Sequence, residues 1–312
     1  MDAMSVLDPA HPRATHAPSL TRATPSGGAG ARWAFAFVGA IVAAVGVWAT
    51  WRFFVASPTG QRVDEVALRG SELGRSRLVE IAEPVLDVVS VPFLVVVVVA
   101  AVVVAAVQRR WGTALRVVVL MVGANLTTQV LKSSILDRPD LGVTPGASNS
   151  FPSGHTTVAA SVAAAALMVV PRGLRPLVAV VGAAYTAATG VATMILGWHR
   201  PSDVIAAIAV VTAWSLLVLI PGAARGSAER GVGGGRTFAV VVLAIAAVAG
   251  LAVGIGALFA TANATVDLPP LLDDVVGELV DRGQLFLAYA GAAAAVGGAA
   301  SVSALTQLLG RR

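Results

Sequence analysis

The sequence predicts an all-α protein, a polytopic bundle of transmembrane helices, and three observations support that prediction. Hydrophobic residues make up 56% of the 312 residues, charged residues only 12%, and the mean hydropathy is +0.81. Long runs of Ala, Val and Leu approach the roughly 20 residues that a helix needs to cross the hydrocarbon core. These runs are continuous, whereas the strands of a membrane β-barrel alternate between apolar and polar residues.

Eight apolar segments are predicted to span the membrane, and the fourth is the shortest. They cover about residues 33–55, 89–107, 113–132, 156–171, 175–197, 203–221, 237–260 and 283–308. We group the first six into a core, residues 33–221, and predict two additional helices within 237–312. The Gly-rich segment 222–236 between them is predicted to be a flexible linker. Residues 1–32, rich in Pro, Ser, Thr, Ala and Gly, are predicted to be a disordered cytoplasmic tail before an uncleaved first helix.

The distribution of charge predicts the orientation of these helices. With the N-terminus in the cytoplasm, the inner segments carry thirteen basic and three acidic residues, and the outer segments carry nine basic and fourteen acidic ones. Because Arg and Lys accumulate in cytoplasmic loops, we expect both termini in the cytoplasm. This orientation accounts for the net charge of +5 better than nucleic-acid binding does, so no nucleic-acid partner is expected. The absence of cysteine excludes disulfides and thiolate metal sites.

Residues 56–88 form an outer segment with two open interpretations. Apolar residues such as Val63, Val66 and Leu73 recur there at helical spacing among charged ones such as Asp64 and Glu65. This pattern is typical of an amphipathic helix on the membrane surface. A solvated hairpin is the alternative.

The first group of chemically informative residues follows the third apolar segment. Lys132, the only lysine of the chain, is followed by Arg138 and Pro139. Each has a structural interpretation, because a lysine at a helix end often anchors the helix at the interface and Arg-Pro is suited to a turn. Together, a lysine point charge and an arginine fork match what phosphate oxygens require.

The second group, Pro152-Ser153-Gly154-His155, opens the fourth apolar segment. Ser153 is a plausible N-cap, and a helix N-terminus offers unpaired N–H groups to an anion. Gly154 lets the backbone approach closely, and His155 is positioned to give a proton to a leaving oxygen. A capped helix with an interfacial histidine is the structural alternative.

The third group lies between the fifth and sixth segments, where Pro201 suits the first turn of a helix that also contains Asp203. Asp203 follows His199 by four residues. An aspartate that accepts a hydrogen bond from one imidazole nitrogen fixes the tautomer and leaves the other nitrogen to attack. The alternative is an aspartate that only stabilises the helix N-terminus. A metal site is disfavoured because few partner ligands are nearby.

Together these three groups resemble the type 2 phosphatidic acid phosphatase (PAP2) family. The resemblance covers about residues 33–221 and implies a six-helix core with two helices added after it. It further implies catalytic residues His199, His155 and Asp203 and phosphate-binding residues Lys132, Arg138, Ser153 and Gly154. It implies attack by a histidine that forms a phosphohistidine, with no metal and no other cofactor.

Two positions depart from the family pattern. Five residues instead of six separate Lys132 from Arg138, and Ala192-Thr193 occupies the place of the family's Ser-Arg pair. Arg200 is the candidate for a compensating cation. If no cation compensates, we expect either a slow enzyme or a different mode of substrate binding, because one charged contact is worth several kcal/mol in the transition state.

The expected function is hydrolysis of a lipid phosphate or diphosphate at the extracytoplasmic face. Phosphatidic acid, phosphatidylglycerol phosphate and polyprenyl diphosphate are all candidate substrates, and the expected partner is such a lipid in the bilayer. The alternatives are a phosphotransferase that uses the same site and an inactive transporter or interaction protein of the same fold. The sequence does not determine the oligomeric state.

Overall fold

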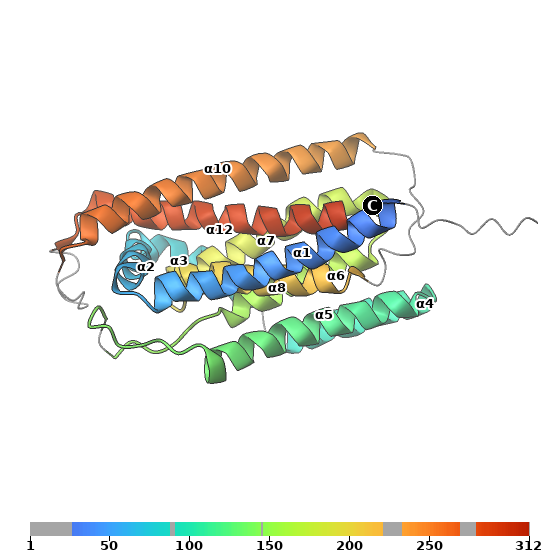
Figure 1. Ribbon diagram of the computed structural model, residues 1–312, viewed down its shortest axis with the longest axis horizontal. Coiled ribbons are helices and arrows are strands. Elements are labelled where there is room, and N and C mark those ends of the chain that lie inside the picture. The colour runs from blue at the N-terminus through green and yellow to red at the C-terminus, as the bar shows by residue number, and fades with distance from the viewer. Residues whose placement is uncertain (1–26, 88–90, 145, 221–232, 269–278, 312) are drawn as a thin grey trace, which may run out of the picture.

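The computed structural model describes residues 27–87, 91–144, 146–220, 233–268 and 279–311. These residues form helices and no strand, which confirms the all-α prediction. Figure 1 shows most of the helices lying side by side along the long axis of the molecule.

Each predicted apolar segment corresponds to a helix. They are α1 (Gly27–Thr50) with a π-helical turn η1 (Trp51–Val55), α4 (Val91–Val107), α5 (Trp111–Val130) with a π-helical turn η2 (Leu131–Ile135), α6 (Gly154–Val169), α7 (Arg175–Ile195), α8 (Pro201–Leu217), α10 (Gly234–Thr265) and α12 (Arg282–Gly310). The segments that contain α1, α5, α7, α10 and α12 are long and apolar enough to cross a membrane, and α4, α6 and α8 are shorter apolar helices. The protein is therefore a membrane protein.

The two predicted flexible segments lie mostly outside the described residues, which leave out 1–26 and 221–232. At their edges the helices begin early. Helix α1 already includes Gly27 to Arg32, and α10 begins at Gly234, so the ends of the predicted tail and linker are helical.

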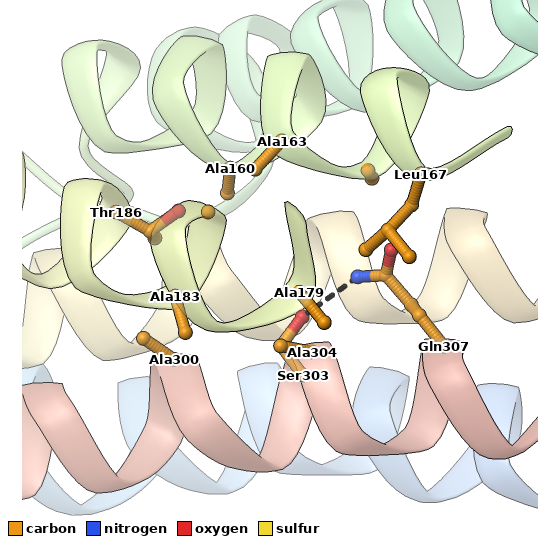
Figure 2. Close-up of a pocket in the computed structure, with 12 residues that line it drawn as sticks. Ala160, Ala163, Leu167, Ala179, Ala183, Thr186, Ala300, Ser303, Ala304 and Gln307 are labelled. Carbon is orange, nitrogen blue, oxygen red and sulfur yellow. Dashed lines mark hydrogen bonds between the residues drawn. The ribbon is translucent and has the colours of Figure 1, made fainter. Parts of the chain in front are cut away.

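Helix α12 packs against α2, α7, α8 and α10, although it follows them all in sequence. Figure 2 shows its contact with α6 and α7, where alanines such as Ala160, Ala183 and Ala304 let the backbones approach closely. A polar network lies in this apolar contact: Ser303 Oγ accepts hydrogen bonds from Gln307 Nε2 (3.1 Å) and from Thr212 Oγ1 of α8 (2.7 Å). The bond from Thr212 links α12 to α8, and the bond from Gln307 lies within α12.

Helix α10 contacts α12 through small residues. A Cβ on Gly250 would lie 2.5 Å from the carbonyl oxygen of Ala294, and one on Gly254 would lie 2.5 Å from the Cβ of Ala295. Close packing of this kind holds membrane helices together by van der Waals contact. The two C-terminal helices therefore form a tight pair.

Residues 56–88 were predicted to form a surface helix or a solvated hairpin, and the structure shows neither arrangement. The segment forms α2 (Pro58–Gly70) and α3 (Arg75–Asp87), and α2 is buried against α8, α10 and α12. Asp64 and Glu65, expected on a polar face, are each only 1% exposed. The helical periodicity was interpreted correctly, but its polar face contacts buried polar partners of the chain instead of water.

Candidate active site

The turn η2, which contains Lys132, and the loop after it, which contains Arg138, lie at one end of the bundle. Three polar side chains hold their carbonyl oxygens: Asn149 Nδ2 donates to Lys132 O (3.0 Å), Trp51 Nε1 to Asp137 O (2.9 Å) and Gln61 Nε2 to Pro139 O (2.9 Å). The loop is thus attached to η1 and α2 by the residues on either side of Arg138.

Ser153 begins α6 as its N-cap, as predicted. Its Oγ accepts the backbone N–H of Thr156 (3.3 Å), and Thr157 Oγ1 donates to its carbonyl oxygen (2.8 Å). The N–H of Ser153 donates to the carbonyl oxygen of Asp203 (2.9 Å). This last bond joins the N-termini of α6 and α8, so that the second and third residue groups meet.

Asp203 lies in the first turn of α8, where its carboxylate organises the loop before the helix. Its Oδ2 accepts hydrogen bonds from Ser150 Oγ (2.6 Å) and from the backbone N–H of Arg200 (2.9 Å), and it lies 3.3 Å from His199 Nδ1. Asp203 is 1% exposed and His199 is 7% exposed. The carboxylate therefore orients the imidazole by Nδ1 and leaves Nε2 for chemistry.

The two histidines face each other across a short gap. The ring centroids of His155 and His199 are 6.2 Å apart with the ring planes inclined at 63°, and the ring centroid of Trp198 lies 5.2 Å from that of His155. Lys132 is close enough to interact electrostatically with both His155 and Asp203. The structure therefore brings the predicted residues of all three groups together at one end of α5, α6, α7 and α8.

Sequence reasoning missed the part played by α2. Asp64 Oδ1 accepts the backbone N–H of Ser202 (3.0 Å) and Asp64 Oδ2 accepts its hydroxyl (2.6 Å). Glu65 Oε2 accepts a hydrogen bond from Nε of Arg200 (3.0 Å) and lies 2.9 Å from Nη2 of the same guanidinium. Two neighbouring carboxylates of α2 thus hold the two residues on either side of Pro201.

Burial and charge set the pKa values of this network. Burial, together with the negative charge of Asp203, raises the pKa of Asp64 to about 7, although its bonds from Ser202 oppose that change. Burial and the positive charge of Arg200 lower the pKa of Arg138. Burial alone would lower the pKa of Arg200, but the carboxylates of Glu65 and Asp64 outweigh it and raise that pKa.

Ala192 and Thr193 lie inside the bundle. Ala192 belongs to an apolar cluster with Ala82 and Leu86 of α3, and Thr193 Oγ1 donates to Gly190 O (2.7 Å). The carbonyl oxygen of Thr193 accepts the N–H groups of Trp198 (2.9 Å) and His199 (3.3 Å). These two residues therefore support the histidine loop through their backbone and apolar contacts.

Ser150, Asp64 and Glu65 carried no sequence signal strong enough to assign them. Ser150 lies two residues before the second group, and a serine in a loop is unremarkable until its partner is known. A buried carboxylate pair was visible only as two acidic residues flanked by Val63 and Val66, a pattern that an exposed amphipathic helix also gives. In the described part of the chain, no three His, Cys, Asp or Glu side chains gather as a metal site would require.

A bundle of helices long and apolar enough to cross a membrane, with two histidines, a buried aspartate and two cations at one end, is the arrangement of an integral membrane protein with a polar site. Residues 92–227 match the PAP2 superfamily, and this match supports a phosphatase-type fold and membership of that superfamily. The resemblance seen in the sequence is thereby confirmed. No curated protein and no solved structure gave a match.

Proposed function

We propose that the protein hydrolyses the phosphate ester or diphosphate of a membrane lipid through a phosphohistidine formed on His199. The observation that carries the proposal is the buried contact of His199 Nδ1 with Asp203 Oδ2, at 3.3 Å, beside His155. A histidine held in this way is in the tautomer that leaves Nε2 unprotonated, which is the form needed for attack.

In the first step Nε2 of His199 attacks phosphorus, and the bond from phosphorus to the leaving oxygen breaks. His155, whose ring is 6.2 Å from that of His199, gives its proton to the leaving oxygen. Asp203 stabilises the positive charge that develops on the imidazole. In the second step His155 takes a proton from water, the water oxygen attacks phosphorus, and the bond between phosphorus and Nε2 breaks to release inorganic phosphate.

Lys132, Arg138, Ser153 and the backbone of Gly154 are proposed to hold the phosphoryl oxygens. A cluster of fixed positive charge and helix N–H groups stabilises the charge spread over these oxygens in the transition state. A direct contact of Arg200 with the phosphate requires its release from Glu65, because the guanidinium is ion-paired there. We therefore assign Arg200 a positioning role in the resting enzyme.

A lipid substrate is supported by the surroundings of the site. Trp198 is 50% exposed and Ile135 58% exposed, and both belong to the segments that carry the predicted catalytic and binding residues. Exposed apolar side chains beside a polar site suit a substrate whose tail stays in the bilayer. By the charge distribution, we further propose that this site faces the extracytoplasmic side.

The test is phosphate release by the purified protein in mixed micelles, with phosphatidic acid, phosphatidylglycerol phosphate and a polyprenyl diphosphate supplied separately. His199→Ala is compared with wild type, and His16→Ala, from the predicted tail, is the matched control. We expect wild type and the control to release phosphate from at least one lipid and His199→Ala to release none.

Each other result points to a stated alternative. Phosphate found on an added alcohol instead of free in solution would identify a phosphotransferase. No release by folded wild type from any lipid would favour the inactive transporter or interaction protein, and release by His199→Ala equal to wild type would refute the histidine mechanism.

A further inference from the structure

A second polar site lies at the other end of the bundle. It is a cavity of about 150 Å³ formed by the first turn of α5, the start of α7 and the end of α12, with α1 beside them. Helix α7 begins at this cavity and ends just before the His199 loop, and its 21 residues span roughly 30 Å. The cavity is therefore separate from the candidate active site.

Arginine dominates the lining of this cavity. The arginines come from four separate segments and are Arg32, Arg110, Arg116, Arg172, Arg175 and Arg311. Among the described lining residues there is no Asp or Glu. We name this site the arginine cavity. Because like charges repel, gathering them raises the free energy of the empty site, and an anion that binds there lowers it.

Two of these arginines have polar atoms that lack an acceptor. Nε of Arg175 and Nε and Nη2 of Arg311 are buried and have no hydrogen-bond partner in the described part of the chain. Arg175 Nη1 donates to the carbonyl oxygen of Arg311 (3.4 Å), so the two side chains are close together. Burial, with the positive charges of Arg175 and Arg116, lowers the pKa of Arg311 to about 9. Buried donors of this kind are costly unless an acceptor reaches them.

The size and surroundings of the arginine cavity restrict the ligand. A water molecule occupies about 30 Å³ in the liquid, so 150 Å³ holds a tetrahedral oxyanion with a few waters. Exposed apolar side chains flank the arginines, among them Trp33, Trp111 and Leu174. Aromatic residues of this kind are typical of the membrane interface, where lipid headgroups lie.

We propose that the arginine cavity binds a phosphate group, carried by an anionic phospholipid or by inorganic phosphate. Planar guanidinium groups bind phosphate oxygens through paired hydrogen bonds, and basic pockets between transmembrane helices bind lipid headgroups. The site contains positive charge without a histidine or carboxylate among its described lining residues, so it binds the anion without transforming it. The proposal is independent of the activity proposed for His199.

The experiment compares two double variants of the full-length protein in uncharged detergent. Arg175→Gln/Arg311→Gln removes two charges from the cavity, and Arg77→Gln/Arg282→Gln removes two charges from exposed positions elsewhere. The melting temperature is followed against phosphatidylglycerol, phosphatidylcholine or inorganic phosphate at constant ionic strength. A ligand that binds only the folded protein raises this temperature increasingly as its concentration exceeds its dissociation constant. Both variants keep the candidate active site, so binding there is common to them.

We expect wild type and the control pair to be stabilised equally and the cavity pair to need at least a tenfold higher ligand concentration. Stabilisation by phosphatidylglycerol and not by phosphatidylcholine or phosphate identifies an anionic lipid, and stabilisation by inorganic phosphate identifies the free ion. If neither anion stabilises wild type, or if the cavity pair responds as wild type does, the proposal is wrong.

Folding of the cavity pair is checked without ligand. Because removal of two charges relieves repulsion, we expect a melting temperature at or above that of the control pair. A much lower value would assign these arginines to the structure itself and overturn the proposal. Arg116→Gln is a second variant that removes one cavity charge and leaves the contact between Arg175 and Arg311 intact, and it is expected to weaken anion binding in the same direction.

Discussion

The two polar ends of the bundle differ in whether carboxylates accompany their basic side chains. At the end that contains His199, carboxylates hold two of the site's side chains: Glu65 pairs with Arg200, and Asp203 contacts His199. At the arginine cavity, the described lining residues include six arginines and no acidic residue. Helices α5 and α7 contribute to both ends, so the same scaffold supports both arrangements.

The difference separates the site that we propose for chemistry from the site that we propose for binding. Paired charges fix the orientation of side chains, which a nucleophile and its partner require. A cluster of like charges around a cavity instead attracts an anion from outside.

The largest effect is expected from Asp203→Asn. The amide cannot hold His199 in the correct tautomer, so we expect kcat/KM for phosphate release to fall about 10³–10⁴-fold. The exposed Asp137→Asn in the neighbouring loop is the control and should retain activity. Retention of more than a tenth of wild-type activity by Asp203→Asn would show that this carboxylate does not orient the nucleophile.

Glu65→Gln should cost about 3–5 kcal/mol of stability, because it leaves the buried guanidinium of Arg200 without its carboxylate. Glu72→Gln is the matched control, since both glutamates pair with Arg69 but the side chain of Glu72 is 43% exposed and that of Glu65 only 2%. We expect the control to cost less than about 1 kcal/mol. Chemical unfolding in detergent measures the stability of both variants. Equal losses of stability would contradict the role of Glu65 as the buried partner of Arg200. A rise in phosphatase activity of Glu65→Gln would assign Arg200 a phosphate contact.

The pH dependence of stability tests Asp64. Its pKa is raised to about 7 in the folded protein from an ordinary value of 3.8, so the unfolded chain loses this proton first as the pH rises. The contribution of Asp64 to stability therefore falls between about pH 4 and pH 7 and is constant above that range. We expect the free energy of unfolding of wild type to fall by up to a few kcal/mol over this pH range. Asp64→Asn should lack this fall, and the exposed Asp140→Asn should retain it. Parallel curves for wild type and Asp64→Asn would refute this assignment.

The smallest effect is expected from the arginine cavity on catalysis. Because distant sites that share no partners act independently, Arg175→Gln/Arg311→Gln should change kcat/KM for phosphate release by less than about threefold. The assay is the same lipid phosphatase measurement, with Arg77→Gln/Arg282→Gln as the control. A large loss of activity in the cavity pair alone would mean that the two ends are coupled.

The sequence by itself determined the helices and the residue groups along them. Segments such as 175–197 and 203–221 are apolar enough that lipid or protein surroundings both favour a helix, and α7 and α8 begin within two residues of the predicted positions. The groups around Ser153 and His199 were visible because their chemistry is local, as with an N-cap and a histidine four residues from its aspartate.

Only the tertiary structure decided which distant residues complete each site. Asp64 and Glu65 form a polar helix face in the sequence, and their burial depends on Ser202 and Arg200, which lie more than a hundred residues away. Ser150 becomes a partner of Asp203 only when the N-termini of α6 and α8 meet. The arginine cavity draws on residues from 32 to 311, and no spacing rule connects them. The physical reason is that hydropathy and spacing report what a segment prefers, whereas a buried charge is decided by the partner that the fold brings to it.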